Sequence, residues 1–135
     1  MGPMSAQSQF ASFLLPETVF REDGAGPAVD LAGVQGKTLL LTLGITRIIE
    51  QESLDVTVRG SADGSTWSAK PILTFPQKFS CGVYAMSLDL SAVPEARYIR
   101  VEWKMSRWGR GELKPLFGFY VFAEETAGVL AAAGG

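Results

Sequence analysis

The segment Leu54–Trp67 reads LDVTVRGSADGSTW and joins an alternating strand pattern to a turn and an aromatic residue. Leu54, Val56 and Val58 alternate with polar residues, which places the apolar side chains on one face of a strand. The pair Asp63–Gly64 tolerates positive φ angles and predicts a turn. We therefore expect one hairpin of an antiparallel β-sandwich, with the terminal tryptophan in the core.

Length and composition favour one folded domain. The chain has 135 residues, of which 47% are hydrophobic and 19% charged. A chain of this size buries a core without disulfide or metal support, and this one is too apolar to be disordered. The low charge also suggests that part of the apolar surface meets a partner.

Charge and residue usage exclude several function classes. The formal net charge of -2 gives no general reason to expect nucleic acid. With no histidine and a single cysteine, Cys81, the chain lacks a disulfide framework and the usual Cys/His metal clusters, so we expect no cofactor. The first ten residues lack the basic start and apolar core of a secretory signal, which predicts cytoplasmic synthesis. The apolar run 38–49 contains Arg47 and is shorter than the roughly 20 residues of a membrane span.

Strand patterns recur along the chain at near-regular spacing, and no amphipathic helix of useful length interrupts them. Beside the central segment, strands are expected at residues 28–31, 38–45, 70–75, 82–90, 97–105 and 116–123. The run 38–45 also fits a helix, but Gly36 and Gly44 bracket it and favour a strand. About seven or eight strands predict an all-β fold, a single antiparallel β-sandwich that is jelly-roll-like.

The two ends of the chain are apolar. Residues 10–20 form a cluster interrupted by Pro16, which fits an edge strand or a segment lying on a neighbouring molecule, and we favour the edge strand. The strand at 116–123 is hydrophobic on both faces. We therefore expect the N-terminal cluster or another molecule to cover the face that is turned away from the core. The expected organisation is an N-terminal arm at 1–12, the sandwich at 13–124 and a low-complexity tail at 125–135.

Two motifs carry a family resemblance. SADGSTW (residues 61–67) and ARYIRVEW (residues 96–103) together resemble the second half of discoidin-like, galactose-binding-like β-sandwiches, and similar pairs occur in β-sandwich modules of phage virions and tails. The resemblance covers about half of the chain and implies a β-sandwich that binds surfaces or glycans without catalysis. Discoidin domains commonly have a cysteine at each end and an early tryptophan, whereas this chain has only the mid-chain Cys81 and no tryptophan before Trp67.

Enzymatic readings have little support. Without histidine, Ser-His-Asp and Cys-His arrangements cannot form, and Cys81 has no evident base. The acidic pairs at 50/52 and 124/125 fall in expected turns or tails, where solvated charge is the ordinary role. Oxygen ligands such as Asp23 and Asp63 suit calcium, but no spacing specifies a site. We therefore expect a non-enzymatic protein without a catalytic or metal site.

The strongest local feature is a basic tract around Trp108. Six of the twelve basic residues lie between residues 97 and 114, which places a tryptophan among cations in a long loop. Such a loop can stack on a sugar or base while the cations hold an anion, or Trp108 can pack under its own loop. The expected ligand or partner-binding residues are Lys104, Arg107, Trp108 and Arg110.

These observations predict a structural subunit of a larger assembly, most plausibly a phage-like virion, tail or capsid-decoration protein. Its partners would be copies of itself and other assembly proteins. The expected assembly interface comprises Phe10, Phe13, Leu14, Phe20, Tyr120, Phe122, Val129 and Leu130. The alternative is a carbohydrate-binding module that recognises glycans through the Trp/Arg loop.

Overall fold

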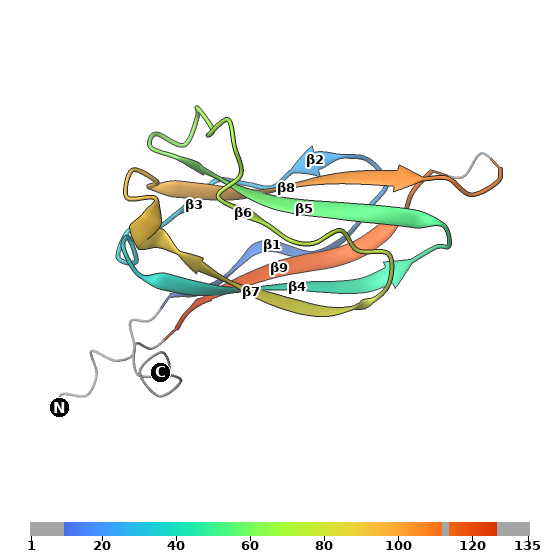
Figure 1. Ribbon diagram of the computed structural model, residues 1–135, viewed down its shortest axis with the longest axis horizontal. Coiled ribbons are helices and arrows are strands. Elements are labelled where there is room, and N and C mark those ends of the chain that lie inside the picture. Colours follow the sequence, from blue (N-terminus) through green and yellow to red (C-terminus); the bar gives the residue numbers. More distant parts are fainter. Residues whose placement is uncertain (1–9, 112–113, 127–135) are drawn as a thin grey trace.

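The computed structural model describes residues 10–111 and 114–126, which form two antiparallel sheets packed face to face (Figure 1). The strands are β1 (Ala11–Phe20), β2 (Gly24–Ala25), β3 (Val29–Asp30), β4 (Thr38–Ile48), β5 (Glu52–Ser61), β6 (Leu73–Thr74), β7 (Gly82–Asp89), β8 (Tyr98–Arg107) and β9 (Phe117–Glu125). The first sheet has the order β1-β9-β4-β7, and the second has the order β2-β8-β5-β6, with β3 also paired to β8. We call them sheet A and sheet B.

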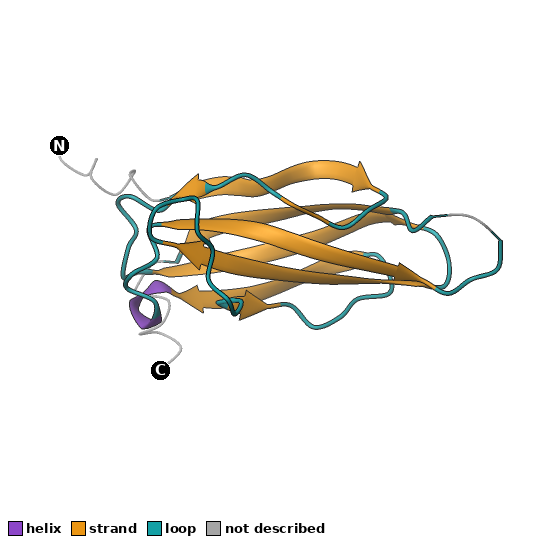
Figure 2. Ribbon diagram, turned by 90° about the horizontal axis from the view of Figure 1, so that it is seen from above, coloured by secondary structure: helices purple, strands orange, loops and turns teal. Residues whose placement is uncertain are grey.

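The strand order is that of a jelly roll. The short strands β2 and β3 both pair with β8, so they act as two pieces of one interrupted strand. The chain then changes sheet at every step except from β5 to β6, which are neighbours in sheet B, as in a double Greek key. Figure 2 shows the strands running along the long axis with the loops gathered at the two ends. The predicted all-β, jelly-roll-like sandwich is confirmed.

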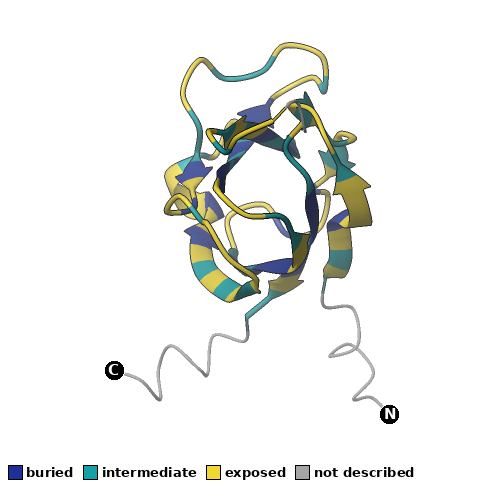
Figure 3. Ribbon diagram, turned by 90° about the vertical axis from the view of Figure 1, so that its right-hand side faces the viewer, coloured by how far each residue is buried: buried dark blue, intermediate teal, exposed yellow. Residues whose placement is uncertain are grey.

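The core lies between the sheets because each long strand alternates in the expected way. On β5 the side chains of Val56 and Val58 are buried, and their partners on β8 are the buried Trp103 and Val101. Sheet A contributes alternate leucines of β4 and the aromatic residues of β9 that face inward. The end-on view shows the buried residues facing one another across the interior (Figure 3).

Strand β1 confirms the edge strand expected at residues 10–20. It pairs only with β9, and its register shifts twice, between Phe13 and Leu15 and between Leu15 and Thr18. The first irregularity lets both Leu14 and Leu15 point into the core, where they are 0% and 5% exposed. Pro16 lies in this irregular stretch, as expected for a proline on an edge.

The central hairpin differs from the prediction in its loop. β5 is followed by a long connection to β6, which pairs with β5 through only two residues instead of the whole expected strand at 70–75. The Asp63 carboxylate accepts hydrogen bonds from the backbone amides of Ser65 and Thr66, both at 2.8 Å. Gly64 has a φ of 83°, so the predicted turn at Asp63–Gly64 is confirmed.

The prediction that Trp67 lies in the core is wrong. Its side chain is half-buried outside the core, and the Arg100 guanidinium lies 4.5 Å from its ring centre. The loop after β5 is long enough to turn the chain over the outer surface of sheet B, so strand alternation does not extend to residue 67. Trp103 lies within the alternating strand β8, and it is in the core with 5% exposure.

The helical content is a single short 3-10 helix, η2 (Leu90–Ala92), within the described residues. No helix in the described ranges is long and apolar enough to cross a membrane.

Candidate functional site

The outer face of sheet A is uncharged in its middle, with Glu17, Asp89 and Glu124 towards its ends. Register places Phe13 of β1 opposite Phe122 of β9, Phe122 opposite Thr42 of β4, and Thr42 opposite Ala85 of β7. The same face carries other uncharged residues. We call the following set the apolar face: Phe13, Leu40, Thr42, Val83, Ala85, Tyr120 and Phe122.

Three aromatic rings cluster on this face. The ring centres of Phe13 and Phe122 are 4.9 Å apart, and those of Phe13 and Tyr120 are 5.8 Å apart, both in edge-to-face geometry. Phe13 nevertheless remains 50% exposed, and Val83 on the far strand is 68% exposed. These apolar side chains lie on the side of sheet A that is turned away from the core.

The outer face of sheet B has the opposite character. Glu102 on β8 accepts from both Arg59 and Arg100, with nitrogen–oxygen distances of 2.8 Å in each pair. Burial acts to raise the pKa of Glu102, but the hydrogen bonds from Arg100 and Arg59 outweigh it and hold the pKa below its usual value. These paired charges give the outer face of sheet B a polar surface.

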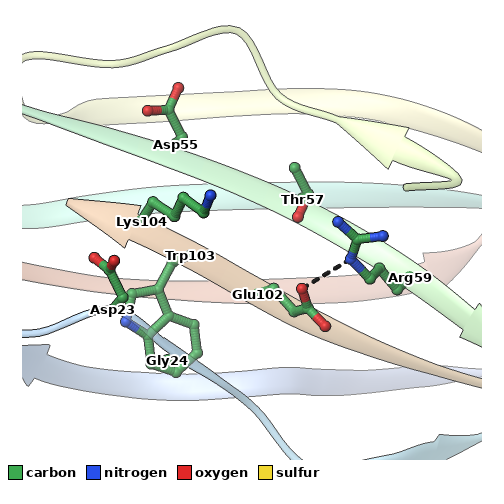
Figure 4. A pocket seen from close by; sticks show the side chains of 8 residues that line it. All are labelled: Asp23, Gly24, Asp55, Thr57, Arg59, Glu102, Trp103 and Lys104. Carbon is green, nitrogen blue, oxygen red and sulfur yellow. Dashed lines mark hydrogen bonds and ion pairs between the residues drawn. The ribbon is translucent and has the colours of Figure 1, made fainter. Parts of the chain in front are cut away.

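An open groove of about 420 Å³ crosses sheet B beside β2 (Figure 4). Most of its polar groups are satisfied by the protein: Asp23 accepts from the Met105 amide and Asp55 accepts from Gln77. No described residue forms an ion pair with Lys104, which lies opposite Asp55 on the neighbouring strand. Among the described residues that line the groove, Lys104 is thus a cation without a carboxylate partner.

The structure brings together only part of the expected assembly interface. Phe13, Tyr120 and Phe122 meet on the apolar face, but Leu14 is fully buried in the core. Phe20 turns inward, with its ring centre 4.4 Å from that of Trp103. Phe10 is half-buried against the core. Val129 and Leu130 lie outside the described residues.

The basic tract is divided by the fold. Arg97 pairs with Asp30, and Lys114 pairs with Glu22. Strand alternation places Lys104 on the outer face of β8 and Arg107 on the inner side. The predicted site of Lys104, Arg107, Trp108 and Arg110 is therefore split between two surfaces.

The end of the sandwich holds the remaining basic residues. Arg107 donates to the Glu50 carbonyl, and its Nε atom is buried without a partner within the described residues. Arg110 is exposed in the loop that follows. Trp108 is 59% exposed, and its ring centre is 6.2 Å from that of Phe79, which is 55% exposed. Phe79 was not identified from the sequence, because the loop that carries it has no pattern linking it to Trp108.

Glu52 was expected to be a solvated charge in a turn, but it lies buried at the start of β5 and has a structural role. Glu52 is 1% exposed, and its two carboxylate oxygens accept from the amides of Ile49 and Leu116 at 2.9 and 2.8 Å. It joins the turn between β4 and β5 to the start of β9. Across the described ranges, no three His, Cys, Asp or Glu side chains gather in a way that would hold a metal ion.

Comparisons with known proteins add a likeness of fold. No protein-family model and no curated protein matches the sequence, so the discoidin-like resemblance has no support from them. A chain in the crystal structure of the T13 IBDV viral particle is similar over 89% of this chain, with 11% identity and a TM-score of 0.56. A chain in the structure of the Gx strain of infectious bursal disease virus has 12% identity and a TM-score of 0.48. This chain spans about a third of each of them, 31% and 32%. The first likeness shows that the fold of this chain also occurs as part of a protein of a viral particle.

Proposed function

We propose that this protein is a non-enzymatic structural subunit of a large assembly of virion type, and that the apolar face is a surface through which it contacts neighbouring subunits. The observation that carries the proposal is the contrast between the outer faces of the two sheets. The outer face of sheet A carries three clustered aromatic rings, of which Phe13 is exposed and Tyr120 and Phe122 are half-buried, whereas the outer face of sheet B presents paired charges.

The energetics favour a covered apolar face. Fully burying one large apolar side chain is worth about 1.5–3 kcal/mol. Phe13 and Val83 each keep at least half of their surface exposed in the single chain, so about half or more of that free energy is still available. The cores of protein interfaces are enriched in aromatic residues and depleted of charged ones, as this face is.

The likeness to a chain of the T13 IBDV particle supports the virion class of assembly. A jelly roll serves many functions, so the fold alone does not select one. A phage-type virion, tail or decoration protein is the narrower form of the proposal. Its partners are copies of this chain and other proteins of the same assembly.

Light scattering after size-exclusion chromatography tests the proposal. The wild-type protein should elute as a multimer, and Phe13→Ser with Phe122→Ser should shift it to the mass of one chain. Trp108→Ser is the matched control, since it also removes an exposed aromatic ring but lies away from the apolar face. A wild-type protein that remains a single chain at high concentration would contradict the proposal.

A second candidate function rests on the exposed aromatic pair at the end of the sandwich. Trp108 and Phe79 present ring surface beside basic residues, which suits a sugar ring carrying an acidic group. The carbohydrate-binding alternative then predicts retention of the wild type on a polysaccharide column and loss of retention in Trp108→Ala. Absence of wild-type retention on neutral and acidic polysaccharides would eliminate it.

A further inference from the structure

The two edges of sheet A differ in how well they are protected against pairing with another chain. β1 carries a proline and two register irregularities, which are common devices against edge pairing. Within residues 10–111 and 114–126, β7 forms the other edge and pairs with β4 alone, in a regular register over all eight of its residues, Gly82–Asp89. It contains no proline, lysine or arginine. The β7 edge is therefore an open template for a further strand.

We propose that β7 pairs in antiparallel fashion with β7 of a second copy of this chain, across a two-fold axis at Ala85. The two four-stranded sheets would then join into one continuous sheet. This inference rests on the proposed function, because it identifies one of the contacts between subunits of the assembly. A two-fold contact uses the same patch on both subunits, so the strand must be complementary to itself.

The sequence of β7 meets that requirement. Residues that face each other in an antiparallel pair lie on the same face of the sheet, so the axis must pass through a residue and not between two. With Ala85 opposite its own copy, Val83 lies opposite Ser87 and Tyr84 lies opposite Met86. None of these pairs contains a charge. An axis at Met86 would instead place the carboxylate of Asp89 against Val83, which is less favourable.

The pairing also extends the apolar face. Val83 and Ala85 point outward from sheet A beside Gly44 and Thr42 of β4. Joining two copies at this edge would bring their apolar faces into one larger surface. The 68% exposure of Val83 would fall as the second strand covers it.

Disulfide trapping tests the pairing directly. The free, exposed Cys81 is first replaced in Cys81→Ser, and Ala85→Cys is added. Facing residues of an antiparallel pair have Cα atoms about 4.5–5.5 Å apart, which is within the range that a disulfide spans. Under mild oxidation at low protein concentration, Ala85→Cys should form a covalent dimer. Val19→Cys on the β1 edge, where Val19 is 38% exposed, is the matched control.

Cross-linking of Ala85→Cys at least tenfold faster than Val19→Cys is the expected result. Equal cross-linking rates would overturn the pairing. This holds whether the β7 edge is occupied by another protein, by the tail of this chain or by water. Light scattering on the same Cys81→Ser protein separates the two proposals. A multimer that does not cross-link at position 85 contradicts the edge pairing and leaves the proposed function intact, whereas a single chain contradicts both.

A charge variant supplies an independent check. Ala85→Lys places two lysines opposite each other on the axis and should abolish the cross-edge contact, while Ala85→Ser should retain it. Because Ala85 is exposed in the single chain, neither change should alter the melting temperature of the isolated subunit. If Ala85→Lys assembles like Ala85→Ser, the pairing is wrong.

Discussion

The ring of Tyr120 on β9 lies directly over the backbone of Gly44 on β4. The two residues are register partners in sheet A, and a Cβ atom at position 44 would overlap the tyrosine ring. Glycine in a strand is normally unfavourable, because it has no side chain to pack and loses more backbone entropy than other residues. Here its missing side chain makes room for an aromatic ring of the apolar face.

Gly44→Ala should therefore destabilise the protein despite the better strand propensity of alanine. Displacing the Tyr120 ring is expected to cost about 1–3 kcal/mol, as overpacking does, against a gain of about 0.5–1 kcal/mol for replacing a strand glycine. Urea denaturation measures the net effect. In a Tyr120→Ala background the same substitution should be neutral or stabilising. An equal cost in both backgrounds would show that the ring is not what restricts position 44.

The buried carboxylate of Glu52 gives a second prediction. Glu52→Ala leaves the amides of Ile49 and Leu116 without their acceptor and should lower the free energy of unfolding by about 2–4 kcal/mol. Glu52→Gln keeps one oxygen acceptor and should cost less. The exposed Glu124 is the matched control, and Glu124→Ala should change stability by less than about 0.5 kcal/mol. Hydrogen exchange should become faster at Leu116 in Glu52→Ala but not in Glu124→Ala.

The Asp63 turn predicts a dependence of stability on acid pH. Hydrogen bonds from the amides of Thr66 and Ser65 and from the Ser61 hydroxyl lower the pKa of Asp63 to about 2. The unfolded chain has a pKa of about 3.9 at this carboxyl group, so the native state binds the proton less tightly. The stabilisation is complete above about pH 5, and is lost progressively as the pH falls through about 2.

Asp63→Asn provides the control for that titration. The asparagine cannot ionise, so the variant should lack this part of the acid dependence while keeping an oxygen acceptor for the turn. NMR titration of the Asp63 carboxyl carbon measures the pKa in the native protein. A native pKa at or above the unfolded value would contradict the hydrogen-bond arrangement.

The two tryptophans of the resemblance motifs should differ in their contribution to stability. Trp103→Ala removes a ring from the core and should cost about 3–5 kcal/mol. Trp67→Ala removes a ring that rests against Arg100 at the surface, and should cost about 1 kcal/mol. Similar large losses of unfolding free energy for both variants, measured by chemical denaturation, would show that Trp67 lies in the core.

The fold could be predicted from the sequence wherever one residue pattern determined one face. Alternation on β5, β7 and β8 correctly separated the inner from the outer side chains, and the edge position of β1 followed from Pro16. Trp67 was misplaced because alternation ends where the loop begins. Leu14 was assigned to the surface because the irregular register that turns it inward depends on pairing with β9, which is not visible in the local sequence.

The candidate site was harder to predict because it depends on which strands are neighbours. Phe13, Tyr120 and Phe122 were named from the sequence as interface residues and cluster on one face, but nothing in the sequence joined them to Val83 on β7. Conversely, Lys104 and Arg107 are near in sequence and lie on opposite sides of β8. Proximity along the chain suggested a single basic site that strand geometry divides.

Electron microscopy of the purified wild-type protein tests the central claim most directly. We predict regular multimers in which the apolar face, including Phe13 and Phe122, lies at a boundary between subunits. Reconstructed density should place sheet B, with its paired charges, toward solvent or a different partner. Dispersed single chains, or a regular assembly that leaves the apolar face open to solvent, would contradict the account.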